Sequence, residues 1–200
     1  QTDKAAEAMG RHSAFGRVLV GVDGSPEARE AARQAAVLAE GPVTLLAVYD
    51  VTPAVVGGTG PFVPTYYDDE YQRERAEKAL ARARDELEGI VAPTGKIVRA
   101  CSWAALLREI ERDQDTLVAV GSHGTGRARG FFVGSTATEL IHKSPCSVLV
   151  ARKAGQRFPT RIVVGVDGSD QSLAALRWAA DEAKLREARL VAVHAWVFIP

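Results

Sequence analysis

The sequence predicts an α/β fold: a doubly wound, Rossmann-like parallel sheet of five strands, followed by a partial second copy with a β-α-β arrangement. Three observations predict it. Short apolar runs alternate with helical segments, glycine-containing turns follow two of these runs, and the opening segment recurs later in the chain. Strands that alternate with helices need crossover connections, so we expect a parallel sheet with helices on both faces.

Five apolar segments are the expected strands: residues 17–22, 43–49, 96–101, 116–120 and 147–151. Ser25 and Pro26 provide an N-cap and a first helical residue for a helix that ends near residue 40. The other helices are expected at about 72–89, 102–112 and 134–143. We expect the first and fourth strands to be neighbours, which brings Asp23 and Gly121 to one crevice at the C-terminal edge of the sheet.

The segment at residues 52–71 is rich in glycine and proline and is expected to be irregular. It carries four aromatic side chains, Phe62, Tyr66, Tyr67 and Tyr71. The segment is therefore a candidate lid over a binding site, with a mobile linker as the alternative.

An internal repeat defines the expected domains. Residues 17–40 match residues 161–184 without a gap and are identical at 12 of 24 positions, and the match resumes at 45–48 and 190–193 after one inserted residue. We expect a flexible tail (1–16), a complete domain (17–152), a linker (153–160) and a partial second domain (161–200) of a truncated tandem protein. Intramolecular packing of the two repeats, or a homodimer formed through the edge strand near residues 147–150, is expected to cover exposed strands.

The composition is that of a soluble globular chain, with 46% hydrophobic residues and 25 basic against 25 acidic side chains. A formal net charge of zero gives no electrostatic reason to expect nucleic acid as a partner. No apolar run is long enough for a bilayer and no secretion signal is visible, which predicts a cytoplasmic protein without membrane contact. The two cysteines, Cys101 and Cys146, are expected to be reduced, buried and inert.

A glycine pattern follows the expected fourth strand and opens a helix: Gly121, Gly124, Gly134 and Ser135. Such a loop is typical of phosphate binding, because the free amides and the dipole of the helix attract anions. Gly121 and Gly124 lack a Cβ, so we expect their backbone to approach ribose and phosphate closely. The hydroxyls of Ser135 and Thr136 add donors.

Other candidate contacts surround this loop. Asp23 follows the first strand and can accept hydrogen bonds from ribose hydroxyls. His123 is expected to face either the phosphates or the solvent. Arg127 and Arg129 are candidate phosphate contacts, with exposed surface arginines as the alternative.

No catalytic group is evident. Ser25 and Ser135 are expected to be helix caps and not nucleophiles, although Ser135 can also bind phosphate. Gly95-Lys96 lacks the other residues of a P-loop, and neither a hydrolase nucleophile elbow nor a zinc-ligand spacing is present in the sequence. The expected protein therefore binds its ligand without a dedicated metal site.

The glycine spacing and the Val-Gly-Val-Asp-Gly-Ser strand end at 20–25 together resemble the ATP-binding form of the universal stress protein family. The resemblance covers residues 17–152 and the opening of a second domain at 161–198. It implies an adenine nucleotide alpha hydrolase-like fold with ATP as ligand and Mg²⁺ as its companion. It also implies that Asp23 contacts the nucleoside, that the backbone of Val48 meets adenine, and that Val120 packs on the base.

The resemblance further implies a role in the stress response or in dormancy, exerted through nucleotide occupancy. Two alternatives stay open: a dimerising interaction module with a vestigial nucleotide pocket, and a slow ATPase or autophosphorylating protein. An adenylating enzyme is disfavoured, because the phosphate loop that such enzymes carry after the first strand is missing where Pro26 follows Ser25.

Overall fold

The computed structural model describes residues 15–50, 69–110, 116–124, 133–152 and 161–196. Two compact units divide the chain: the first is Phe15–Lys153, and the second comprises Ala154–Pro200 together with Gln1–Ala14. Most of the expected tail, the expected linker, nearly all of the candidate lid, and both Arg127 and Arg129 lie outside the described residues.

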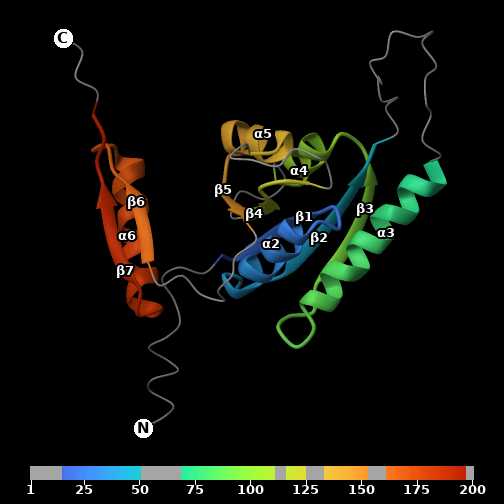
Figure 1. Ribbon diagram of the computed structural model, residues 1–200, viewed down its shortest axis with the longest axis horizontal. Helices are drawn as coiled ribbons and strands as arrows, with labels where there is room; N and C mark the ends of the chain where they lie inside the picture. Colours follow the sequence, from blue (N-terminus) through green and yellow to red (C-terminus); the bar gives the residue numbers. More distant parts are fainter. Residues whose placement is uncertain (1–14, 51–68, 111–115, 125–132, 153–160, 197–200) are drawn as a thin grey trace. The chain divides into compact units, whose positions relative to one another are not determined.

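The first unit is built on five parallel strands in the order β3-β2-β1-β4-β5 (Figure 1). Their bounds are β1 (Arg17–Val22), β2 (Val43–Tyr49), β3 (Thr94–Arg99), β4 (Thr116–Gly121) and β5 (Ser147–Ala151). The predicted fold class is confirmed. So is the expected pairing of the first and fourth strands, which runs in register from Arg17 opposite Thr116 to Val20 opposite Ala119.

Helices cover both faces of this sheet (Figure 1). On one face, α2 (Pro26–Val37) and α3 (Asp69–Glu86) pack against Val18, Val20 and Leu45. On the other face, α4 (Ser102–Ile110) and α5 (Ser135–Lys143) pack against Leu19, Leu46 and Val118. Successive residues of a strand point to opposite faces, so each strand contributes to both cores. None of the described helices is both long and apolar enough to cross a membrane.

The small buried side chains of α2 allow this helix to lie close to the sheet. Its five buried residues are all alanines: Ala28, Ala31, Ala32, Ala35 and Ala36. The predicted N-cap is confirmed, because the Ser25 hydroxyl accepts a hydrogen bond from the amide of Ala28 at 3.1 Å. The helix ends at Val37, earlier than expected: Leu38 is its C-cap, and the Leu38 amide donates to the carbonyl of Ala35 at 3.1 Å, three residues back.

Two other elements, α3 (Asp69–Glu86) and β3 (Thr94–Arg99), begin and end a few residues earlier than predicted. Helix α3 begins at Asp69 and ends at Glu86, ahead of a turn in which Gly89 has φ +77°. Strand β3 begins directly after Pro93, at Thr94. Its Gly95 lies so close to α3 that a Cβ there would be 2.8 Å from a methyl carbon of Leu80.

The prediction of buried cysteines is wrong. Cys101 is exposed and Cys146 is half-buried, and both are free thiols. Each lies in a connection at an end of a helix or strand, where Cys146 still packs partly against the core beneath α4 and α5 and Cys101 does not. Cys101 comes directly before α4, and the Cys146 sulfur lies 3.3 Å from the hydroxyl oxygen of Ser144.

The described part of the second unit repeats the β-α-β arrangement. It consists of β6 (Arg161–Gly165), α6 (Asp170–Leu185) and β7 (Arg189–Val193), and the two strands are parallel. Its helix has 16 residues against 12 in α2. Two valines of this small sheet are largely exposed, Val163 by 56% and Val193 by 46%.

The strand register differs between the repeats. Gly21 pairs with Leu46 in the first unit, and its counterpart Gly165 pairs with Val193 in the second. The sequence match places Val191, not Val193, opposite Leu46, so the second register is displaced by two residues. An even displacement keeps every side chain on its own face, and a two-stranded sheet has little buried surface with which to select one register.

We expect Gly41→Ala to destabilise the first unit. A Cβ at Gly41 would lie 1.9 Å from the carbonyl oxygen of Gly16, and both partners are backbone, so the chain must shift to make room. The expected loss is roughly 1–3 kcal/mol of unfolding free energy in urea, followed by circular dichroism. Gly165→Ala is the control, because a Cβ there has no neighbour within 4 Å. Equal stability of the two variants would contradict this packing.

The turn after β6 lowers the pKa of Asp167 and so predicts a change of stability in acid. The Ser169 hydroxyl and amide both donate to the Asp167 carboxylate, at 2.6 and 2.9 Å, and lower its pKa from 3.8 to about 2. Because the folded-state pKa is depressed, this turn stabilises the second unit above about pH 3.8 and loses its effect as pH falls through about 2. Carboxyl-carbon NMR titration should show the low midpoint. Ser169→Ala should raise it, whereas Ser25→Ala in the first repeat should leave it unchanged.

Candidate functional site

A cavity of about 320 Å³ opens at the C-terminal edge of the sheet in the first unit. Its walls come from the ends of β1, β2 and β4 and from the beginnings of α2, α4 and α5. The structure brings together nine of the predicted site residues there: Asp23, Val48, Val120, Gly121, His123, Gly124, Gly134, Ser135 and Thr136. Their roles toward a ligand stay predictions.

The turn after β1 presents Asp23 to this cavity. Its carboxylate oxygen Oδ1 accepts a hydrogen bond from the amide of Ser25 at 2.9 Å, and Gly24 adopts φ +82°, a conformation that glycine tolerates best. A Cβ on Gly124 would lie 2.7 Å from Asp23 Oδ2. The missing side chain of Gly124 therefore lets the glycine loop lie directly against the carboxylate.

Gly121 has a packing role that the sequence did not predict. A Cβ at this position would lie 2.8 Å from the amide nitrogen of Ala28 and 2.8 Å from the carbonyl carbon of Glu27. The first turn of α2, and not a ligand, thus occupies the space that the missing side chain leaves. Gly121 is therefore needed for packing of a helix on a strand end, and its predicted role in the close approach of ribose and phosphate stays a prediction.

The loop closes onto α5 through its backbone. The amide of Gly134 donates to the carbonyl of Ser122 at 2.7 Å, and Gly134 is the N-cap of α5 without a side-chain capping bond. Ser135 is the first helical residue, so the prediction that it caps the helix is wrong. Among the described residues, neither the Ser135 nor the Thr136 hydroxyl has a hydrogen-bond partner. Both hydroxyls line the cavity at the positive end of the helix dipole.

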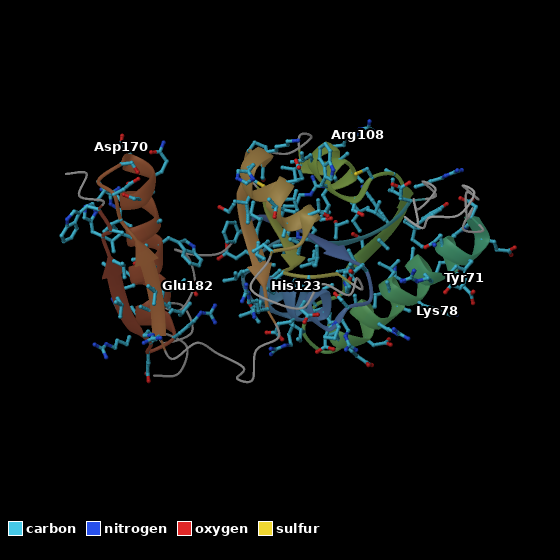
Figure 2. All side chains as sticks on the ribbon, turned by 45° about the horizontal axis from the view of Figure 1, so that its top comes forward. Tyr71, Lys78, Arg108, His123, Asp170 and Glu182 are labelled. Carbon is cyan, nitrogen blue, oxygen red and sulfur yellow. The ribbon has the colours of Figure 1, made fainter. Side chains whose placement is uncertain are left out.

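His123 lies against the cavity and is not a freely exposed loop residue (Figure 2). Its Nδ1 is 3.1 Å from the hydroxyl oxygen of Ser122, while its Nε2 is buried and has no hydrogen-bond partner among the described residues. The Ser25 hydroxyl is 3.4 Å from the His123 carbonyl and links the turn after β1 to the glycine loop. Buried polar atoms are usually partnered, so the unpartnered Nε2 is an unusual feature of this loop.

The other side of the cavity is apolar. Leu46, Val48, Leu106 and Val120 line it, and Ser102 adds one hydroxyl at the start of α4. Sequence reasoning did not assign Leu46, Leu106 or Ser102 to the site. A serine directly after a strand-to-helix connection at the C-terminal edge was a signal for Ser102, because such connections form the ligand crevice in parallel sheets.

Carboxylates are scarce at this site. Asp23 is the one acidic side chain among the described lining residues. No group of three or more His, Cys, Asp or Glu residues is placed to hold a metal ion within the described ranges. The residues therefore fit Mg²⁺ only as the companion of a phosphate ligand that supplies most of the oxygens.

Comparisons with known proteins agree on one family. The universal stress protein family model matches residues 14–152 and 159–199. A universal stress protein of Mycolicibacterium smegmatis is 34% identical over 195 residues, which cover 90% of this chain and 64% of that protein. One from Mycobacterium tuberculosis is 32% identical over 189 residues, covering 90% and 63%. The chain thus spans less than two thirds of the length of these relatives.

Solved structures share the fold. A universal stress protein from Archaeoglobus fulgidus matches with a TM-score of 0.63 and 18% identity over 89% of this chain and 65% of its own. One from Lactobacillus plantarum has a TM-score of 0.55 and 21% identity over 70% and 100%. A universal stress protein in complex with cAMP has a TM-score of 0.52 and 20% identity over 71% and 100%. By its match to the family model along most of its length, this chain belongs to the universal stress protein family.

Proposed function

We propose that this chain binds an adenine nucleotide, ATP in the first place, in the cavity of its first unit, and that its role in the stress response depends on nucleotide occupancy. One observation carries the proposal. The Asp23 carboxylate, an apolar wall and the hydroxyl-bearing start of α5 line the same cavity. These are the three kinds of surface that ribose, base and phosphate require.

The sheet order supports an orientation for the ligand. Most of the apolar wall is at β2 and α4, with Val120 added from β4, Asp23 follows the central strand β1, and α5 begins beyond β4. Neighbouring strands are about 4.8 Å apart, so the distance across β2, β1 and β4 is about 10 Å. Base at β2, ribose at β1 and phosphates at α5 would match this sequence of surfaces.

The cavity also has a suitable size. Its volume of about 320 Å³ falls at the lower end of the range that is usual for small-molecule sites, about 300–1,000 Å³. The cAMP complex of a protein with the same fold shows that an adenine nucleotide is one ligand found in this family. For this chain the proposal rests on its own residues.

We favour binding over turnover. The Ser25 hydroxyl already caps α2, and Asp23 already accepts a bond from its own turn. Catalysis needs groups that stabilise the transition state more than the bound substrate, and amides and hydroxyls that hold phosphates do not by themselves do so. Nucleotide would then act by ordering the surfaces around the cavity, which a partner reads.

We expect calorimetric titration of the full chain to show saturable ATP binding that Asp23→Asn weakens by about tenfold, because a charge-assisted hydrogen bond to ribose is lost. The repeat supplies a matched control. Asp167→Asn changes the equivalent carboxylate of the second unit. The Asp167 side chain is exposed and does not line the cavity. Absence of saturable binding to the unaltered chain would favour the interaction module with a vestigial pocket.

The start of α5 should contribute mainly to phosphate binding. We expect the double variant Ser135→Ala with Thr136→Val to weaken ATP by roughly three- to thirtyfold and adenosine by much less, because only ATP places oxygens at these hydroxyls. Titrating both ligands into the same variant measures the difference. Equal weakening of adenosine and ATP would contradict the proposed orientation.

A further inference from the structure

We propose that Ser25 is a positioning residue of the nucleotide site, because its hydroxyl ties the turn that carries Asp23 to the glycine loop that leads to α5. This inference rests on the proposed function and adds a residue that acts on the ligand through its neighbours. The Ser25 side chain belongs to a buried residue, 3% exposed, and is not among those that line the cavity. Its effect on a nucleotide must therefore pass through the groups to which it is bonded.

One hydroxyl serves both sides of the junction. Its oxygen accepts a hydrogen bond from the Ala28 amide at 3.1 Å and so caps α2. Its proton is donated to the His123 carbonyl, which lies 3.4 Å away in the glycine loop. A buried hydroxyl needs an acceptor for its proton, because a polar group that has lost both water and partner is unfavourable. The cap uses only the oxygen of Ser25, so the donated bond is a second function of the same side chain.

The donated bond reaches the start of α5 through a short stretch of backbone. His123 follows Ser122, whose carbonyl accepts a bond from the Gly134 amide at 2.7 Å, and Gly134 is the N-cap of α5. On the near side, the Ser25 amide donates to the Asp23 carboxylate at 2.9 Å. Ser25 thus connects the group that is proposed to hold ribose with the helix start that is proposed to hold phosphate, and its bonds help to keep their separation.

A kept separation matters only for a ligand that contacts both sides. ATP extends from Asp23 to the start of α5 in the proposed orientation, whereas adenosine ends at the ribose. The bond from Ser25 to His123 is long for an O–H···O bond, so we expect its loss to have no more than the effect of one ordinary hydrogen bond. Its loss should weaken ATP several-fold and leave adenosine nearly unchanged, whereas a general loosening of the fold would weaken both ligands.

The test is a double-mutant cycle, measured by calorimetric titration of the full chain with ATP and with adenosine. We expect Ser25→Ala to weaken ATP by roughly three- to tenfold and adenosine by less than about twofold. In the background of Ser135→Ala with Thr136→Val, the same change should weaken ATP by less than about twofold, because the hydroxyls that Ser25 positions are then gone.

Two further variants separate the donated bond from the helix cap. Ser25→Gly also removes the hydroxyl, but glycine is nearly as good an N-cap as serine, so an effect on ATP as large as that of Ser25→Ala is expected. Ser169→Ala removes the equivalent cap of α6, where the Ser169 hydroxyl accepts from the Ser172 amide at 3.2 Å. This control should leave both affinities unchanged. Thermal unfolding followed by circular dichroism checks that each variant is folded.

The outcomes separate the two proposals. If the unaltered chain does not bind ATP, the nucleotide function itself fails and the role of Ser25 fails with it. If ATP binds but Ser25→Ala weakens neither ligand, or weakens both alike, Ser25 is a helix cap alone and its positioning role is overturned while the nucleotide function stands. Additive effects across the cycle would overturn the role as well, because Ser25 would then act independently of α5.

Discussion

The site depends on the close contact between the end of β4 and the first turn of α2. Gly121 lies so near to Glu27 and Ala28 that no side chain fits between them. This contact places the turn that carries Asp23 beside the loop that carries His123 and Gly124, and the Ser25 hydroxyl joins the two. The rest of the cavity lies on the two sides of this junction: most of the apolar wall is on the β2 side, and Val120 and the start of α5 are on the β4 side.

The fold could be predicted from local patterns because each element carries its own signal. The apolar strands, the Ser25 cap and the Pro26 start are all readable within a few neighbouring residues. The meeting of the predicted residues at one cavity could be predicted for a similar reason, since the ends of parallel strands meet at one edge. Why a particular residue is required at a position was harder to predict from the sequence. The need for glycine at 121 arises from residues more than ninety positions away, and Ser102 joins the cavity only through the placement of α4.

An error of one residue in a predicted helix boundary changes the role that is assigned to the residue at that boundary. The cap of α5 is Gly134 and not Ser135. The Ser135 hydroxyl therefore lines the cavity and does not cap the helix. The cysteines were misjudged because a residue type that is usually buried was not weighed against its place in a connection. The displaced register of β6 and β7 has another origin: similar strand sequences do not fix a pairing when few neighbours pack on them.

The Asp-Gly-Ser turn occurs twice and takes the same form both times. Gly24 and Gly168 have φ of +82° and +88°, and in both copies the serine amide donates to the aspartate at 2.9 Å. The second copy achieves this without a glycine loop among its described residues. The turn is therefore preorganised by its own residues, so the ligand proposed above would meet a carboxylate already in place and would lose little affinity to ordering it. Duplication can pass on such a turn intact, and a second loop placed beside it would complete a site of the proposed kind.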